Sequence, residues 1–339
     1  MTSLLDDPRY LPFKLDLVGR RVLWLRLDAA QRHDAAFLDD RAIPANAEGG
    51  WLPIDAMLNR EDEAAIPADA IFHIGHCGST LLSRLLDGWP QVQGLREPLP
   101  LRTLAEAWPE RDQPQSRLSP VQASQLLRAL WSRWSQPLPP QSRSVVKATS
   151  SCNGLITALL DQNPAMRAVL LDMPLQPYLA TLLKSPASVL DAANAAGERL
   201  RDLHERGFAD GVALHALTPA QQCAMGWLAE RVRFDAAANG EHRGRVLRVD
   251  FEALLAQPRE QLLRMAGHLS LDPSSLDAVM ESPVWSRYSK AQSHGYSRDD
   301  RGHDLALAMQ RHGAEIAEGE AWVEDRMQRH PQLRVIAGR

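Results

Sequence analysis

The stretch 71–87, IFHIGHCGSTLLSRLLD, decides the fold, because it reads as a buried strand, a tight turn and an amphipathic helix. Gly75 and Gly78 bracket the turn, where the missing side chains let backbone N–H groups approach a ligand. The helix that follows has one apolar face, opposite its Ser, Arg and Asp, made of Leu81, Leu82, Leu85 and Leu86.

This turn predicts an anion-binding site. A helix start carries unpaired N–H donors and a partial positive charge, so phosphate or sulfate is the natural ligand of a glycine-rich turn that feeds it. Two residues separate Gly75 from Gly78, and no lysine precedes Ser79, so the Walker spacing G-x-x-x-x-G-K-[ST] is absent. An ordinary ATP or GTP hydrolase is therefore disfavoured. Taken alone, the turn also fits any strand–turn–helix unit of an α/β protein.

The sequence around the turn resembles the sulfotransferases. Their 5′-phosphosulfate loop is roughly a strand, Pro-Lys/Arg-Ser-Gly-Thr-Thr and a helix. The likeness continues through 85–92 (LLDGWPQV) and 96–98 (REP), the layout of tyrosylprotein and bacterial sulfotransferases, and returns at 250–258 (DFEALLAQP). The resemblance covers about residues 70–300. It implies transfer of a sulfuryl group from 3′-phosphoadenylyl sulfate to a hydroxyl or amine acceptor, leaving adenosine 3′,5′-bisphosphate, with no metal.

The resemblance also implies the residues that bind the donor. The 5′-phosphosulfate would be held by the loop residues Gly75, His76, Cys77, Gly78, Ser79 and Thr80. A late polar segment, 282–304, is rich in cations and hydroxyls that suit a phosphate. Lys290, Arg298 and Arg301 of this segment would close the donor site, as a late basic loop does in the family. The other interpretation of the segment is a solvated loop.

Three residues are the catalytic candidates. Glu97 falls where the protein-tyrosine sulfating enzymes carry an acidic pair, and would act as the base for the acceptor. Lys147 ends a core strand, as a lysine does in many sulfotransferases, and would neutralise the sulfonate. His76 replaces the loop Lys or Arg and would contact a bridging oxygen when protonated. Alternative roles are a structural ion pair for Glu97 with Arg96, Arg102 or Lys147, and a nucleophilic thiolate at Cys77 beside the helix start.

One family motif is missing. Sulfotransferases bind the 3′-phosphate with an Arg at a strand exit and a Ser two helical turns later. Here Asp172 or Met173 stands at the first position, and Ala180 or Thr181 at the second. An acid would repel a phosphate, so a second hypothesis stays open: a nucleotide- or phosphate-binding protein, or another group transferase of kinase-like type, without sulfation activity.

Composition limits the partners. The 339 residues carry a net charge of −4, with 45% hydrophobic and 24% charged residues, which favours an ordinary globular protein with no general attraction to nucleic acid or membrane. Three isolated cysteines give no metal or disulfide pattern. The acidic N-terminus is unlike a signal peptide and no apolar run is long enough for a membrane span, so a cytoplasmic protein is expected. The expected acceptor is a small molecule or a peptide, and the sequence indicates no oligomeric state.

Strand and helix patterns predict an α/β fold, a doubly wound parallel sheet of about five strands with P-loop-like architecture. Residues 1–66 are expected to form an N-terminal β-containing element, with a hairpin from 13–17 and 20–28 and a further strand end at 37–41. The α/β domain is predicted over 67–305, and a C-terminal helical extension over 306–339.

Overall fold

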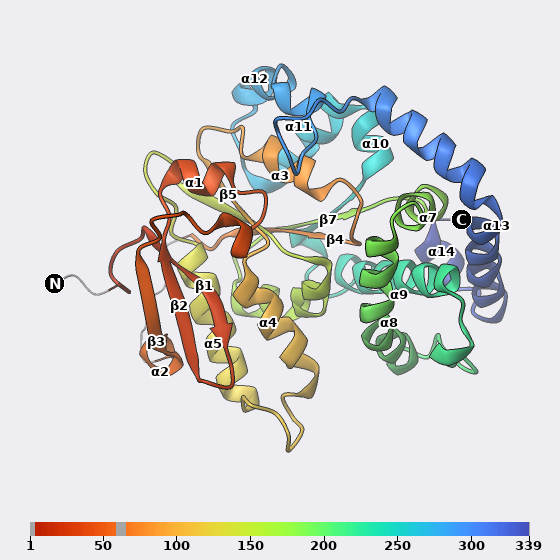
Figure 1. Ribbon diagram of the computed structural model, residues 1–339, viewed down its shortest axis with the longest axis horizontal. Coiled ribbons are helices and arrows are strands. Elements are labelled where there is room, and N and C mark those ends of the chain that lie inside the picture. The colour runs from red at the N-terminus through yellow and green to blue at the C-terminus, as the bar shows by residue number, and fades with distance from the viewer. Residues whose placement is uncertain (1–3, 59–65, 339) are drawn as a thin grey trace.

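The computed structural model describes residues 4–58 and 66–338 (Figure 1). Its core is a five-stranded parallel sheet in the order β5-β6-β4-β7-β8. The strands are β4 (Asp69–His73), β5 (Val92–Arg96), β6 (Arg143–Lys147), β7 (Ala168–Asp172) and β8 (Val246–Asp250). Every residue of β4, β5 and β7 is buried, because helices cover both faces of the sheet. The predicted α/β class and the five parallel strands are confirmed.

The strand order creates one crevice. The chain leaves central β4, adds β5 and β6 on one side, and then adds β7 and β8 on the other. Ligands of open α/β sheets bind at such a reversal, outside the carboxyl ends of the strands. The turn that follows β4 therefore opens into this crevice.

Helices lie above and below the sheet in the view of Figure 1, with α3, α11 and α12 on one side and α5 and α9 on the other. The helices of the α/β part are α3 (Ser79–Leu86), α4 (Leu99–Ala107), α5 (Pro120–Trp134), α6 (Ile156–Gln162), α7 (Leu175–Leu183), α8 (Pro186–Glu205), α9 (Pro219–Asn239), α10 (Phe251–Ala256), α11 (Pro258–Leu269), α12 (Leu276–Met280), α13 (Arg298–Arg329) and α14 (Leu333–Ala337). The long helix α13 bends at His312, which has non-helical φ −119° and ψ 23°. The division of the chain into three parts stays a prediction.

The N-terminal element is an antiparallel sheet of β1 (Tyr10–Asp16), β2 (Arg21–Arg26) and β3 (Gly49–Pro53), with the short helices α1 (Ala29–Asp34) and α2 (Ile54–Leu58). The predicted hairpin is confirmed. The expected strand end at 37–41 is wrong, because the Asp39 carboxylate accepts the backbone N–H of Arg41 and starts a 3₁₀ turn there. The strand that completes the sheet is β3.

The turn after β6 is a 3₁₀ turn, η3 (Ser150–Leu155), which precedes α6. Among the described residues, no side chain caps the start of either helix. Asn153 points inward, where its Nδ2 donates to the carbonyl of His73 at 2.9 Å and to Glu230 at 2.7 Å.

A buried ion cluster centred on Glu230 links the helices to the end of the central strand. The Glu230 side chain is 0% exposed and accepts from Arg199 of α8 at 2.9 Å and Arg233 of α9 at 3.4 Å, besides Asn153. Buried charges are tolerated when each has a partner of opposite charge, and removing one partner leaves the others uncompensated.

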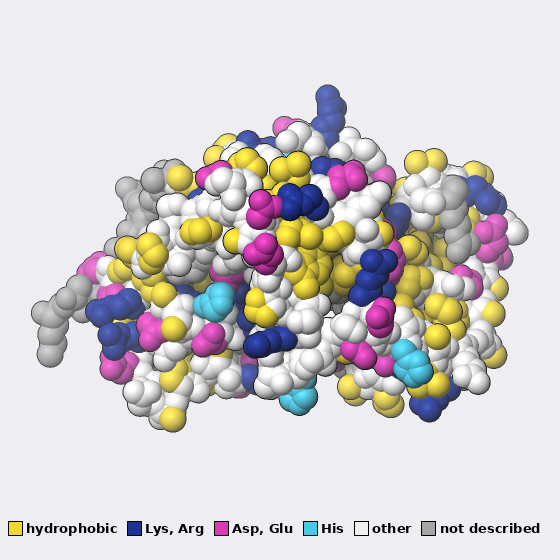
Figure 2. Space-filling view, turned by 90° about the horizontal axis from the view of Figure 1, so that it is seen from above, with side chains coloured by type: hydrophobic (Ala, Val, Ile, Leu, Met, Phe, Trp, Pro, Cys, Tyr) yellow, Lys and Arg dark blue, Asp and Glu magenta, His cyan; other side chains and the backbone are white. Residues whose placement is uncertain are grey.

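Lysines and arginines are interspersed with acids over the face shown in Figure 2, in keeping with the small net charge. Within 4–58 and 66–338, the structure contains no helix with both the length and the apolar composition to span a bilayer.

We predict that Glu230→Leu destabilises the fold by about 3–5 kcal/mol, because the buried guanidinium of Arg199 loses its carboxylate partner, whereas Arg233 keeps Glu198 and Asp202. Urea unfolding followed by circular dichroism measures the change. Glu241→Leu, at an exposed glutamate, is the matched control and should change stability by less than about 0.5 kcal/mol. Equal midpoints for the two variants would mean that the cluster does not stabilise the fold.

Candidate functional site

The turn between β4 and α3 adopts a backbone that glycine favours. Gly75 and Gly78 have φ of 85° and 79°, and His76 between them has φ 50°. A non-glycine residue in the left-handed region costs about 1–3 kcal/mol, and such strain is concentrated at functional sites. A Cβ on Gly78 would lie 2.1 Å from the Phe251 ring, so that ring packs directly on the turn.

The N-terminus of α3 is left open for a ligand. Gly78 is its N-cap and supplies no side-chain hydrogen bond, so the first N–H groups of the helix, at Ser79 and Thr80, have no cap acceptor. Their dipoles and the partial charge of the helix point at the end of the central strand. The predicted anion site therefore has suitable backbone geometry.

A cleft of about 1240 Å³ opens over this turn. Most of the residues predicted from the sequence line it: Gly75, His76, Gly78, Ser79, Thr80, Glu97, Lys147, Lys290, Arg298 and Arg301. Helices α4, α7 and α8 form its other walls. Strand ends that are far apart in the sequence thus converge on one space.

Cys77 is the loop residue whose side chain lies outside the cleft. It is 0% exposed, and its Sγ contacts the carbonyl of Leu171 at 3.5 Å. Burial, and then the charge of Asp172, raise the pKa of the Cys77 thiol to about 12. This environment disfavours the thiolate nucleophile that the sequence left open.

Glu97 and Lys147 form an ion pair at the ends of β5 and β6. The Lys147 side chain is 1% exposed and its ammonium donates to the Glu97 carboxylate, while the Glu97 N–H donates to the Lys147 carbonyl at 2.7 Å. Burial lowers the pKa of Lys147, against the opposing effect of Glu97. Glu97 has φ 53°, so both it and His76 are in left-handed backbone. Of the three ion-pair partners weighed from the sequence, the structure selects Lys147.

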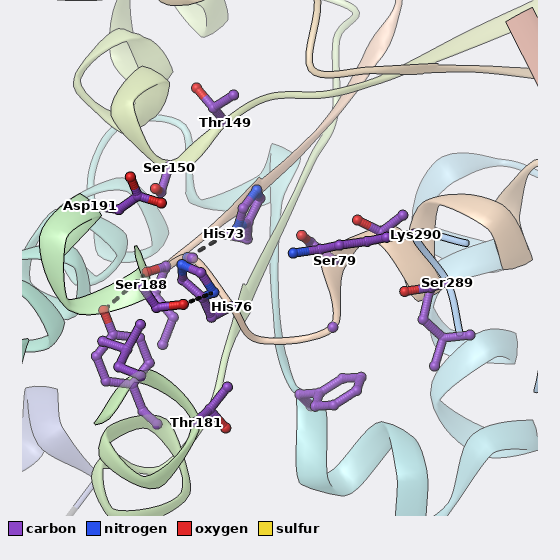
Figure 3. Close-up of a pocket in the computed structure, with 18 of the residues that line it drawn as sticks. His73, His76, Ser79, Thr149, Ser150, Thr181, Ser188, Asp191, Ser289 and Lys290 are labelled. Carbon is purple, nitrogen blue, oxygen red and sulfur yellow. Dashed lines mark hydrogen bonds between the residues drawn. The ribbon is translucent and has the colours of Figure 1, made fainter. Parts of the chain in front are cut away.

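His76 faces the cleft as a neutral imidazole. Its Nδ1 lies 3.5 Å from the Ser188 hydroxyl, and burial followed by the charge of Lys290 lowers its pKa below the usual value. The lowered pKa of His76 reduces the partial positive charge expected of it near neutral pH, and the cations that contribute to this lowering are Lys290 and Lys147. Figure 3 shows the Lys290 amine directed past Ser79 toward the two histidines.

His73, at the end of β4, contacts the turn through a hydrogen bond with Gly75. Its Nδ1 accepts the Gly75 N–H at 3.0 Å, which places the ring proton on Nε2. Nε2 is buried and has no hydrogen-bond partner among the described residues. Burial, then Lys147 and His76, lower the pKa of His73 well below its usual value. His73 thus has a structural role in holding the turn.

The late segment reaches the site in two ways. Lys290 extends into the cleft, and its Nζ lies 5.9 Å from the centre of the Phe37 ring. Arg298 and Arg301 are on the first turn of α13, where Arg298 donates to the Leu255 carbonyl at 3.1 Å. Arg301 pairs with Glu252 and lies over the Phe251 ring at 5.2 Å. Arg301 thereby supports the ring that packs on Gly78.

Asp172, one of the two residues at the first position of the missing 3′-phosphate motif, is paired with arginines away from the cleft. Asp172 accepts from Arg231 at 3.0 Å and from Arg248 at 2.8 Å, and it does not line the cleft. Its charge is compensated, so the repulsion expected from the sequence is corrected. Met173 and Ala180 are buried, whereas Thr181 lines the cleft and donates to the Pro177 carbonyl at 2.8 Å.

Sequence reasoning missed several residues of the cleft wall: Phe37, Lys184, Ser188 and Asp191. They come from the N-terminal element and from helices α7 and α8, and no motif surrounds them. Only their packing around the turn identifies them.

No protein-family model matches this chain, and no curated protein matches it. Similar solved structures include the sulfotransferase domain from the curacin biosynthetic pathway, at 12% identity over 76% of this chain and 98% of that one, with a TM-score of 0.42. A sulfotransferase from Alicyclobacillus acidocaldarius has 13% identity over 75% and 96%, with a TM-score of 0.36. Mouse sulfotransferase SULT7A1 complexed with PAP has 10% identity over 85% and 96%, with a TM-score of 0.39. These three similar structures are sulfotransferases.

We predict that the free energy of unfolding decreases as the pH is lowered below about 6.5, and that it decreases less steeply in His73→Leu. Because the pKa of His73 is lower in the folded chain than in the unfolded one, the unfolded chain binds the extra proton as the pH falls. The slope of unfolding free energy against pH should therefore decrease by up to about 1.4 kcal/mol per pH unit between pH 6 and 5. Urea titrations at several pH values measure it, and an unchanged slope contradicts the neutral state of His73.

Proposed function

We propose that this chain is a sulfotransferase that uses 3′-phosphoadenylyl sulfate as donor. The observation that carries the proposal is the uncapped start of α3, at the end of the central strand, in a cleft that Lys147 and Lys290 also line. Backbone amides, two hydroxyls and two ammonium groups are a donor set for a tetrahedral anion, and the cleft exceeds the volume of a small anion. The residues present fit a phosphosulfate.

Each residue has a separate task in this proposal. The amides of 76–80 and the hydroxyls of Ser79 and Thr80 bind the 5′-phosphate. Lys147 offsets charge on the transferred sulfonate, as a preorganised cation does in phosphoryl transfer. Glu97 takes the proton of the acceptor hydroxyl or amine while the new bond to sulfur forms. The bond from sulfur to the bridging phosphate oxygen breaks, and adenosine 3′,5′-bisphosphate leaves.

The ion pair between Glu97 and Lys147 suits this division of labour. The Lys147 ammonium donates to the Glu97 carboxylate, so the two side chains that the proposal uses are in direct contact. Once Glu97 has taken up the proton of the acceptor, the ammonium loses its partner and is free to interact with the sulfonate oxygens. Proton uptake by Glu97 and stabilisation of the sulfonate charge by Lys147 are therefore coupled, because the two side chains form one ion pair.

A second candidate is a nucleotide-binding protein or kinase-like transferase without sulfation activity. Asp172 favours it, since the strand exit lacks the arginine that would read a 3′-phosphate. In the sulfotransferase proposal Lys184, which lines the cleft at the end of α7, takes over that phosphate. The acceptor would be a small molecule or a peptide, and a cytoplasmic location stays a proposal.

We predict that adenosine 3′,5′-bisphosphate binds at least about tenfold more tightly than 5′-AMP, because the 3′-phosphate adds at least one charge-assisted hydrogen bond. Isothermal titration calorimetry with these two ligands and ADP measures it. Gly78→Ala should abolish binding, since its Cβ would collide with Phe251, and Gly154→Ala is the matched control, because a Cβ there meets nothing within 4 Å. Tighter binding of ADP would favour the kinase-like candidate, and binding of none of the three would eliminate both.

We also predict that Glu97→Gln lowers turnover by about a hundredfold or more while leaving affinity for adenosine 3′,5′-bisphosphate within about threefold. Turnover is measured with radiolabelled donor on an acceptor found by screening hydroxyl and amine compounds and peptides. Glu110→Gln, at an exposed glutamate outside the cleft, is the control. Normal turnover in a Glu97→Gln protein of lowered stability would assign Glu97 a structural role only.

A further inference from the structure

Arg84 is a buried arginine that joins three separate parts of the chain. It lies on α3, one turn beyond Thr80, and is 7% exposed. Its Nε donates to the Ser289 carbonyl at 2.7 Å, and its two terminal nitrogens donate to the carbonyls of His33 at 3.4 Å and Asp34 at 3.1 Å. One guanidinium thus connects the helix of the anion loop, the end of α1 and the late segment.

The burial of this charge requires a reason. Among residues 4–58 and 66–338, no carboxylate lies within ion-pair distance of Arg84, so its guanidinium is satisfied by neutral carbonyls. Burial, and then the neighbouring Arg96, lower the pKa of Arg84 to about 10. A buried polar group is stabilised by the hydrogen bonds that it makes, so the three carbonyls of Ser289, His33 and Asp34 are what the Arg84 guanidinium holds in place.

The part of the late segment that Arg84 holds is a compact loop, 286–297, which we call the flap. Its two ends are joined by the bridge between Arg287 and Gly295 and by the Tyr296 N–H, which donates to the Ser286 carbonyl at 3.0 Å. Inside it, the Tyr288 and Tyr296 rings pack edge to face at 5.6 Å. The flap is therefore ordered by its own contacts, and it is tied to its surroundings by Arg84 through the Ser289 carbonyl and by the Tyr296 hydroxyl, which donates to Asp304 at 3.1 Å.

The residue after Ser289 is Lys290, whose ammonium shares the Phe37 ring with Lys147. The Nζ of Lys290 and that of Lys147 lie 5.9 Å and 5.6 Å from the ring centre. The two ammonium groups repel each other, and each of them lowers the pKa of His76. Keeping Lys290 in this position without an anion requires a fixed backbone, and Arg84 supplies it one residue away.

We propose that Arg84 is a positioning residue that sets Lys290 over the anion loop, so that the affinity of the site depends on a guanidinium that never touches the ligand. The proposal deepens the function proposed above and rests on it for the identity of the ligand. In this proposal the flap and the end of α1 both help to position Lys290, since Arg84 donates hydrogen bonds to both. Lys290 is the group that contacts the anion, and Arg84 acts through it.

A double-mutant cycle with adenosine 3′,5′-bisphosphate tests this dependence. Lys290→Met should weaken binding about tenfold by calorimetry, the effect of losing one charge-assisted contact. Arg84→Met should weaken it by a similar factor, and the double variant should be no weaker than Lys290→Met alone. Arg84→Lys should behave like Arg84→Met, because an ammonium cannot reach three carbonyls at fixed angles. Arg245→Met is the matched control: this arginine also donates to backbone carbonyls, of Leu160 and Asn163, but outside the cleft.

Hydrogen exchange tests the flap without any ligand. Arg84→Met should accelerate amide exchange in 286–297, and Arg245→Met should not. Unchanged affinity and exchange in Arg84→Met, or losses that multiply in the double variant, would overturn the proposal. So would unfolding of both Arg84→Met and Arg84→Gln, since Arg84 would then serve the fold as a whole. Wild-type protein that fails to bind the ligand defeats the proposed function, while the exchange result still decides the role of Arg84.

Discussion

The site depends on one constraint: the helix that follows the central strand begins without a capping side chain. Gly78 is left-handed and is covered by Phe251, so a side chain there has neither the conformation nor the space. The amides that a serine or aspartate cap would have satisfied remain available, at the point where the strand order reverses. His73 below the turn takes one of its N–H groups, that of Gly75, and leaves those of the helix start.

Around this turn the structure holds positive charge by three different means. Lys147 is buried and paired with a carboxylate, Lys290 is exposed in the cleft at the tip of the flap, and Arg301 lies over Phe251. An anion bound at the turn would meet cations whose positions are set before it arrives. Such preorganisation lowers the entropic cost of binding and is also what stabilises charge in a transition state.

The N-terminal element takes part in the site and does not merely extend the fold. Its Phe37 ring lies beside both lysines, and its carbonyls at His33 and Asp34 anchor Arg84. Its packing on the α/β part is fixed by Arg133, which donates to the Tyr10 carbonyl at 2.8 Å and lies over Trp24. Contacts of this kind couple a cleft at the sheet edge to a small antiparallel sheet that is remote in the sequence.

The sequence by itself determined the parallel sheet, the turn at 75–78 and the convergence of Glu97 and Lys147 at strand ends, because these follow from local signals: apolar runs, glycine spacing and the rule that parallel strands end at one edge. Only the tertiary structure decided what each charge meets. Asp172 reads as an acid at a phosphate site until Arg231 and Arg248 are seen to compensate it, and His76 reads as a partly charged cation until burial is seen to lower its pKa. Arg84 carried no signal at all, since its partners are backbone carbonyls, 50 or more residues away, whose chemistry is the same in every residue.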